Sequence, residues 1–152
     1  DPERAVEKMT AGLAIQKQYE DNGIRASLVP HAPYSVTFSL WKLLAEHFES
    51  HTISMHNQET LAENEFFQTK TGSFLGMYER TKVALDFFKA TGLTSVRSVL
   101  PYFQKANRSI LVHNSFTSVE DIQAVHAAMP IGTPKMPAPR ARHHVSDRVS
   151  GW

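Results

Sequence analysis

The sequence predicts an α/β fold, in which the strands of a parallel sheet alternate with helices packed outside it. Segments with apolar residues at helical spacing alternate with short apolar segments, in the order helix, strand, helix, strand, helix, strand, helix. Each of the three predicted strands ends at a histidine, namely His31, His56 and His113. The carboxyl ends of parallel strands share one edge of the sheet, where active sites of β/α barrels are built. The three histidines together therefore indicate a site, although a single one is more typical of a structural residue.

Two helices and two strands are expected in the first part of the chain. Asp1 and Pro2 are typical of a helix start and Gly23 of a helix end, so a first helix is expected between them. Residues 25–30 form the first predicted strand, and residues 52–56 alternate apolar and polar side chains as a second strand does. A second helix is predicted by a row of apolar residues at helical spacing: Leu40, Leu43, Leu44 and Phe48.

The second part of the chain is expected to hold helices, one more strand and a closing helix. Residues 61–106 are helical in character and are interrupted by Gly72, Gly76, Gly92 and Pro101. Residues 109–113 form the third predicted strand. Thr117 and Glu120 have the spacing of a capping box, which predicts a helix beginning there. Residues 131–152 are rich in Pro and Arg without apolar periodicity, and we interpret them as an irregular tail from a truncated or frame-shifted reading.

Composition narrows the class of protein. The chain has 152 residues, which fits one domain. Its net charge of +1 gives no electrostatic reason to expect nucleic acid or an anionic membrane as a partner. No apolar run approaches the roughly 20 residues of a membrane-spanning helix. Cysteine is absent, which excludes thiolate ligands and fits a cytoplasmic location. We therefore expect a small-molecule substrate, and any metal site must use His, Asp or Glu. The sequence does not indicate an oligomeric state.

Glu59 follows His56 by three residues. An imidazole is a good ligand for a borderline divalent ion, and a carboxylate beside it can transfer the protons of an activated water without binding the metal. Alternatively, Glu59 lies in the first turn of the next helix, where its charge suits the helix dipole. The spacing alone leaves both interpretations open.

Three short motifs occur in order along the chain: Val29-Pro30-His31-Ala32-Pro33-Tyr34-Ser35, Ile53-Ser54-Met55-His56-Asn57-Gln58-Glu59-Thr60 and Ile110-Leu111-Val112-His113-Asn114. Together they resemble the amidohydrolase superfamily, in the branch of cytosine, guanine and S-adenosylhomocysteine deaminases and related chlorohydrolases. The resemblance implies a (β/α)8 barrel. Residues 1–130 would be the central part of that barrel domain, with about three β/α units corresponding to strands 4–6, so the barrel is not closed.

The resemblance also implies roles for four residues. His31 would line the substrate pocket, and His56 would bind one divalent ion, Zn or Fe. Glu59 would shuttle the proton, and His113 would orient the attacking water. The family's first-strand His-x-His pair is not found in this sequence, and neither is its eighth-strand aspartate, since Asp147 lies in the tail without strand context.

The implied function is hydrolytic deamination of a nucleobase-like or other amidine-type compound. Metal-bound hydroxide would attack the carbon of the C–N bond, Glu59 would relay the proton, and ammonia would leave. Two alternatives stay open: a dechlorinase or amide-hydrolysing relative with the same metal site, and a non-catalytic α/β binding or scaffold module. This chain by itself is expected to be inactive, because it supplies few ligands for the metal.

Overall fold

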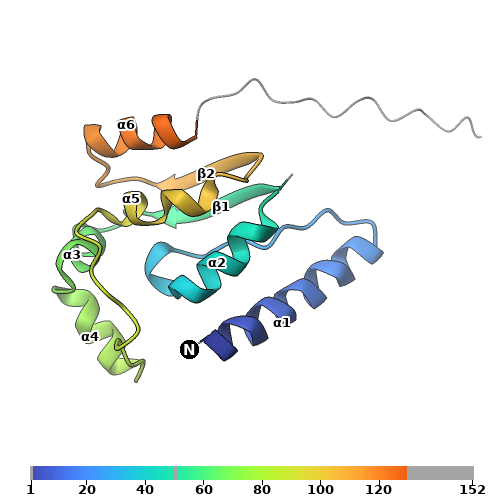
Figure 1. Cartoon of the computed structure of the whole chain (residues 1–152), viewed down its shortest axis with the longest axis horizontal. Coiled ribbons are helices and arrows are strands. Elements are labelled where there is room, and N and C mark those ends of the chain that lie inside the picture. Colours follow the sequence, from blue (N-terminus) through green and yellow to red (C-terminus); the bar gives the residue numbers. More distant parts are fainter. Residues whose placement is uncertain (1, 50, 130–152) are drawn as a thin grey trace, which may run out of the picture.

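The computed structural model describes residues 2–49 and 51–129, which form an α/β fold around a two-stranded parallel sheet (Figure 1). Strand β1 spans Thr52–Asn57 and strand β2 spans Arg108–His113. Their register pairs His56 with Val112 and Asn57 with His113. The α/β class and the strands expected at residues 52–56 and 109–113 are confirmed.

Helices precede, connect and follow the two strands. They are α1 (Pro2–Asp21), the 3-10 helix η1 (Pro33–Ser35), α2 (Phe38–His47), α3 (Leu61–Thr69), α4 (Ser73–Arg80), α5 (Ser95–Val99), the 3-10 helix η2 (Leu100–Phe103) and α6 (Val119–Ala128). The hydroxyl of Thr37 accepts the backbone N–H of Leu40 and caps the start of α2. In Figure 1, α6, β2, β1, α2 and α1 follow one another from top to bottom, and the crossover from β1 to β2 runs through α3, α4 and α5.

Residues 25–30 do not form the strand that the sequence predicts. This segment has neither helix nor strand structure, although the backbone carbonyl of His31, which follows it, accepts the N–H of His56 at 2.9 Å. Pro30 has no N–H to donate, which weakens any ladder with β1. The described sheet therefore has two strands where three were expected.

Two further predictions are corrected. The capping box begins one residue later than expected, at Ser118, whose hydroxyl accepts the N–H of Asp121 at 3.2 Å. The reason is that Asp121, and not Glu120, stands at the third helical position, from which a side chain reaches back to the cap. Residues 81–94 hold no helix, so the helical character of residues 61–106 is interrupted in the middle.

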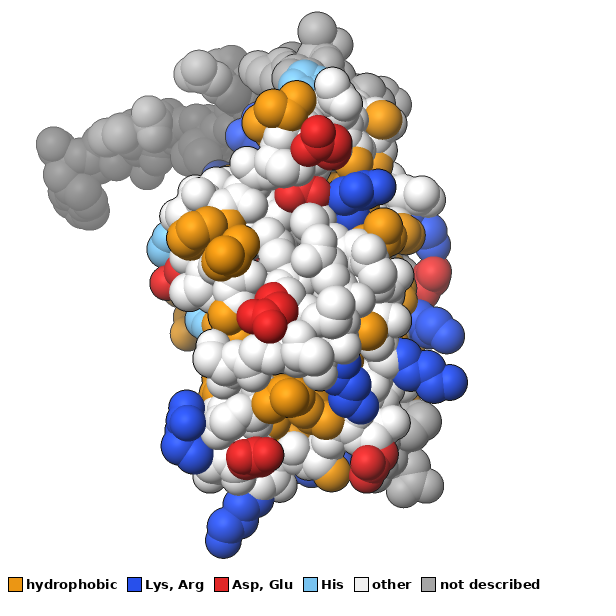
Figure 2. All heavy atoms as spheres, turned by 90° about the vertical axis from the view of Figure 1, so that its left-hand side faces the viewer, with side chains coloured by type: hydrophobic (Ala, Val, Ile, Leu, Met, Phe, Trp, Pro, Cys, Tyr) orange, Lys and Arg blue, Asp and Glu red, His pale blue; other side chains and the backbone are white. Residues whose placement is uncertain are grey.

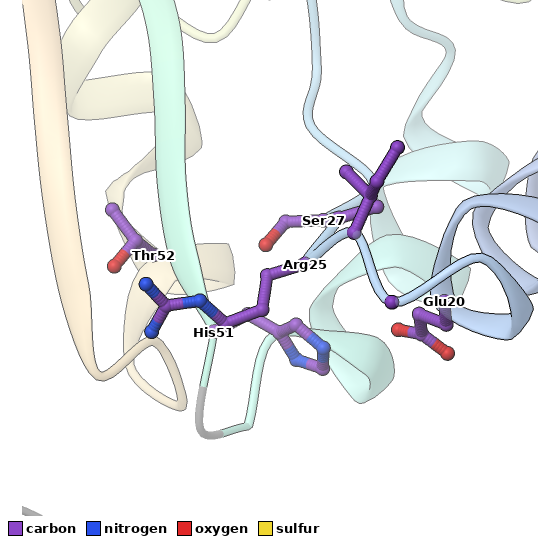
Figure 3. A pocket seen from close by; sticks show the side chains of 8 residues that line it. Glu20, Arg25, Ser27, His51 and Thr52 are labelled. Carbon is purple, nitrogen blue, oxygen red and sulfur yellow. The ribbon is translucent and has the colours of Figure 1, made fainter.

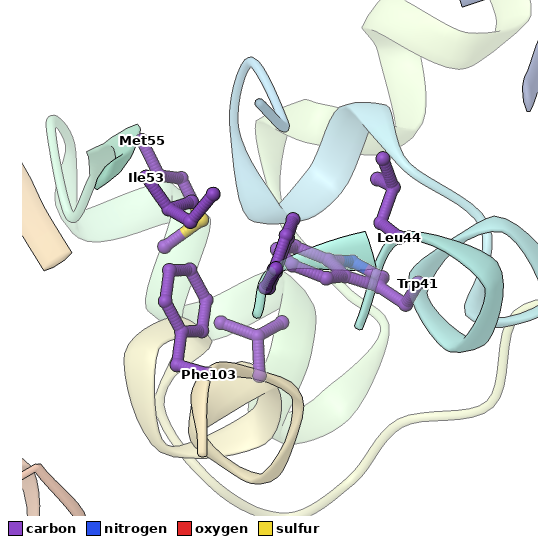
Figure 4. Packing of buried hydrophobic residues seen from close by; sticks show 7 residues of the cluster. Trp41, Leu44, Ile53, Met55 and Phe103 are labelled. Atoms are coloured by element: carbon purple, nitrogen blue, oxygen red, sulfur yellow. The ribbon is translucent and has the colours of Figure 1, made fainter. Parts of the chain in front are cut away.

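The main core lies between the sheet and the helices on one of its faces (Figure 4). Its buried members come from α2, β1, α5 and η2: Trp41, Leu44, Phe48, Ile53, Met55, Val99 and Phe103. From β2, Leu111 packs against this core. Each such side chain contributes roughly 1.5–3 kcal/mol when it is removed from water. The residues that alternate with them, including His56 and Ile110, are half-buried or exposed, so the second face of the sheet is open.

A second cluster fixes the crossover. It consists of Phe66, Phe67, Tyr78 and Phe88, and the rings of Phe66 and Phe88 stack with centroids 4.3 Å apart. The hydroxyl of Tyr78 donates to the backbone carbonyl of Tyr34. This hydrogen bond connects α4 to η1. Figure 2 shows the side of the molecule that lies at the left of Figure 1, where acidic, basic and small groups of apolar side chains are interspersed.

Within residues 2–49 and 51–129, no helix is both long enough and apolar enough to cross a membrane. The predicted tail, residues 131–152, lies outside the described residues, and so does Asp147 within it.

Candidate active site

The carboxyl ends of β1 and β2 bring two of the predicted histidines into contact. Nδ1 of His56 lies 3.0 Å from Nε2 of His113, and the two rings stack with centroids 5.0 Å apart and planes 26° apart. At this distance the two nitrogens either share a proton or present their lone pairs to a common cation. Parallel pairing of the strands therefore brings two histidines that are 57 positions apart in the sequence into contact at one edge of the sheet.

The backbone at His113 turns its ring toward His56. In the register of the sheet His113 pairs with Asn57, and it follows by two residues Leu111, which packs on the core. Regular alternation would put the side chain of His113 on that covered face, opposite to His56. Instead the backbone becomes left-handed at His113 (φ 73°) and at Asn114 (φ 56°). Such angles are uncommon outside glycine and are often found at functional sites.

His31 and Glu59 complete the group of predicted residues. The ring of His31 lies 4.9 Å from that of His56, at an interplanar angle of 57°. Oε1 of Glu59 lies 3.8 Å from Nε2 of His113, which makes an ion pair when the imidazole is protonated. The side chains of His113 and Glu59 remain 36% and 52% exposed, so solvent reaches both. The structure thus brings all four residues together, and their individual roles stay predictions.

A buried carboxylate that sequence reasoning did not identify lies directly behind this group. Glu63, in the first turn of α3, is 1% exposed. Its Oε1 accepts the backbone N–H of Gln58 at 3.1 Å, and its Oε2 accepts that of Glu59 at 3.3 Å. Burial raises the pKa of Glu63, while hydrogen bonds from Ser95 and from the two backbone N–H groups act in the opposite direction. The backbone of Gln58 is left-handed, with φ 48°.

The side chain of Gln58 links the site to α6. It is fully buried, and its Nε2 donates to Oδ2 of Asp121 at 2.7 Å and to Oδ1 of Asn64 at 3.2 Å. Its Oε1 accepts the hydroxyl of Thr117 at 2.5 Å. Asp121 also accepts the hydroxyl of Thr94 at 2.6 Å. In the sequence, Thr117 marks the expected start of a capping box and Asp121 stands at capping-box spacing from Ser118, but neither pattern predicts the contacts with Gln58.

Tyr34 adds an aromatic side chain at the same edge. Its ring packs edge-on against Phe74, with centroids 4.7 Å apart. Burial raises the pKa of the Tyr34 phenol, and the nearby charges of Glu63 and Glu59 raise it further. The phenol is therefore a hydrogen-bond donor near neutral pH.

His56 and His113 supply part of the ligand set that a divalent ion requires. Two nitrogens bound to one tetrahedral zinc at its usual bond lengths are about 3.3 Å apart, close to the separation of the His56 and His113 nitrogens. Catalytic zinc sites usually have three protein ligands. Among residues 2–49 and 51–129, no three His, Asp or Glu side chains are grouped to hold a metal. The described residues can thus offer two imidazole donors, with Glu59 beside them.

One cleft lies away from this group of residues. It has a volume of about 620 Å³ and is lined by Glu20, Arg25, Ser27, His51 and Thr52, among others (Figure 3). Thr52 begins β1, so this cleft is at the opposite end of the strand from the histidines. Active sites of parallel β/α folds lie at the carboxyl ends of the strands. The edge that carries His56 and His113 is therefore the better candidate for the active site. A smaller, mostly apolar cavity of about 360 Å³ between α1 and α2 reaches His31.

Comparison with known proteins shows similarity to deaminases. No protein-family model matches the sequence. The chain is 28% identical over 162 aligned residues to aminodeoxyfutalosine deaminase of Deinococcus radiodurans, a match that covers 99% of this chain and 38% of that protein. It also matches the crystal structure of Helicobacter pylori aminofutalosine deaminase with a TM-score of 0.63 and 26% identity, over 80% of this chain and 31% of that chain.

These relatives are deaminases of the amidohydrolase superfamily, so the resemblance inferred from the three motifs is confirmed. The chain spans 38% of the length of the curated relative.

Proposed function

Since the relatives of this chain are deaminases of the amidohydrolase superfamily, we propose that it is the central part of a (β/α)8 metal-dependent hydrolase that deaminates a small molecule. In this arrangement β1 and β2 are strands 5 and 6, and residues 25–30 occupy the place of strand 4. The observation that carries the proposal is the meeting of His56 and His113 at the carboxyl ends of parallel strands, with Glu59 3.8 Å from His113.

In the proposed reaction each residue acts according to its position. His56 would hold one divalent ion, Zn or Fe, together with further ligands that the resemblance assigns to the family's first and eighth strands. When bound, the ion supplies Lewis-acid activation of the attacking water near neutral pH. Glu59 would accept a proton from the attacking water and deliver it to the substrate, since its exposed carboxylate lies beside His113. His113 orients the water, and His31 and Tyr34 face the substrate.

The substrate is proposed from the same relatives. By their names, they deaminate aminodeoxyfutalosine and aminofutalosine. We therefore take these two compounds as the first candidates within the wider class of nucleobase-like and amidine-type compounds. Ammonia is the product common to the whole class.

The test uses the full-length protein, loaded with Zn or Fe, and measures ammonia release from both candidate compounds. Glu59→Gln should lower kcat by about a hundredfold or more while the bound metal stays unchanged, because an amide cannot accept the proton. Glu65→Gln, an exposed change in the same region of the chain, is the control and should retain wild-type turnover. Absence of ammonia release from any amidine-type compound, or normal turnover in Glu59→Gln, would refute the proposal.

A further inference from the structure

The turn between β1 and α3 is held by a carboxylate that has no cation beside it. Glu63 is 1% exposed, and within the described residues no ion pair involves it. A carboxylate buried in this way costs stability unless hydrogen bonds compensate it. Both of its oxygens are used by backbone N–H groups, those of Gln58 and Glu59. The hydrogen bonds thus connect the buried charge to the residue proposed to move the proton.

These hydrogen bonds differ from those of an ordinary helix start. Thr60 is the N-cap of α3 and Glu63 is the third helical residue, the position from which a capping box reaches the N–H of the N-cap itself. Here the carboxylate reaches further back, to the two residues that precede Thr60, and no capping box is formed. The interaction therefore stabilises the turn and not the helix end.

The turn needs such support because its backbone is unfavourable. Gln58 has a φ of 48°, a left-handed conformation that costs about 1 kcal/mol or more in a residue other than glycine. The side chain of Gln58 is anchored separately by Asp121 and Asn64. Glu63 fixes the peptide groups on both sides of this residue, and so determines where the side chain of Glu59 starts.

We propose that Glu63 is a positioning residue, whose carboxylate holds the Gln58–Glu59 backbone so that the Glu59 side chain stays beside His113. The inference rests on the proposed function of Glu59. Glu63 itself does not touch the substrate, and its effect is on the placement of the proton acceptor. Misplacement of a catalytic group by an ångström is enough to reduce turnover by about a hundredfold.

The test compares Glu63→Gln with Glu65→Gln in the full-length protein. Glutamine keeps the shape of the side chain, but its amide NH2 can no longer accept one of the two N–H groups. Residue-resolved hydrogen exchange should therefore be accelerated about tenfold or more at the Gln58 or the Glu59 amide. The kcat should fall about tenfold to a hundredfold, while KM and metal content stay at the wild-type level. Glu65→Gln, whose carboxylate is exposed and bonded to Thr71, should change none of these quantities.

The outcomes separate this proposal from the one on which it rests. Unchanged exchange at both amides in Glu63→Gln, or accelerated exchange with an unchanged kcat, would overturn the role of Glu63. If the variant does not fold, exchange in the wild-type protein decides: Gln58 and Glu59 amides that exchange as fast as exposed loop amides would refute the backbone contacts. A wild-type protein without deaminase turnover would refute the proposed function, while the exchange measurement would still test the contacts.

Discussion

Replacing Asp121 with alanine should lower the free energy of unfolding, because it removes the hydrogen bonds that connect the site to α6. Asp121 is fully buried, and its carboxylate accepts Gln58 Nε2 at 2.7 Å, Thr94 Oγ1 at 2.6 Å and the N–H of Ser118 at 3.2 Å. Hydrogen bonds to a charged group contribute about 1.5–3 kcal/mol each, and a lost cap contact costs about 1 kcal/mol. Because alanine also removes the cost of burying the carboxylate, we expect a net loss of about 2–4 kcal/mol.

The assay is urea-induced unfolding of the 152-residue chain, followed by far-UV circular dichroism. Gln123→Ala, an exposed change on the same helix, is the control and should alter the free energy of unfolding by no more than about 0.5 kcal/mol. Asp121→Asn keeps the shape of the side chain and one oxygen acceptor, so its loss should be smaller than that of Asp121→Ala. A free energy of unfolding for Asp121→Ala that equals that of Gln123→Ala would show that the buried network does not stabilise the fold.

Three further predictions concern the metal and pH. In the full-length protein, His56→Ala should lower metal content and turnover together, measured by elemental analysis and ammonia release; normal metal content would remove His56 from the ligand set. The isolated chain should retain less than one equivalent of Zn after dialysis, because its described residues offer two imidazole donors where catalytic sites usually have three ligands. Burial raises the pKa of Glu63 in the folded protein above that in the unfolded chain. The stability that Glu63 contributes is therefore present in full below the ordinary Glu pKa and is lost as pH rises through the pKa of the folded state. Urea unfolding across this window should therefore show wild type losing stability relative to Glu63→Gln as pH rises.

The strands could be predicted from the sequence because their signals are local. Residues 52–56 and 109–113 alternate or cluster apolar side chains, and both segments are strands in the structure. Residues 25–30 have a similar apolar composition but lack a strand's hydrogen-bond ladder. Whether an extended segment is a strand depends on the partner that it pairs with, and composition does not report this.

The contact between the histidines was predictable in outline but not in detail. Histidines at the ends of adjacent parallel strands are expected to be close. Regular alternation, however, places His113 on the covered face, and only the left-handed backbone at that residue brings it to His56. The role of Gln58 was not predictable, because its partner Asp121 lies 63 residues away and its burial depends on the packing of α3 and α6.

The register between β1 and β2 has a consequence for which insertions and deletions the protein can tolerate. His56 and His113 meet because Asn57 pairs with His113 at the last rung of the ladder. Removing one residue within β1 would exchange its two faces, bury the imidazole among the core side chains and expose Met55. An added residue in the crossover at 81–94, which belongs to neither strand, would leave that rung intact. Natural length variation among homologous sequences should therefore be concentrated in that stretch and be absent from the two strands.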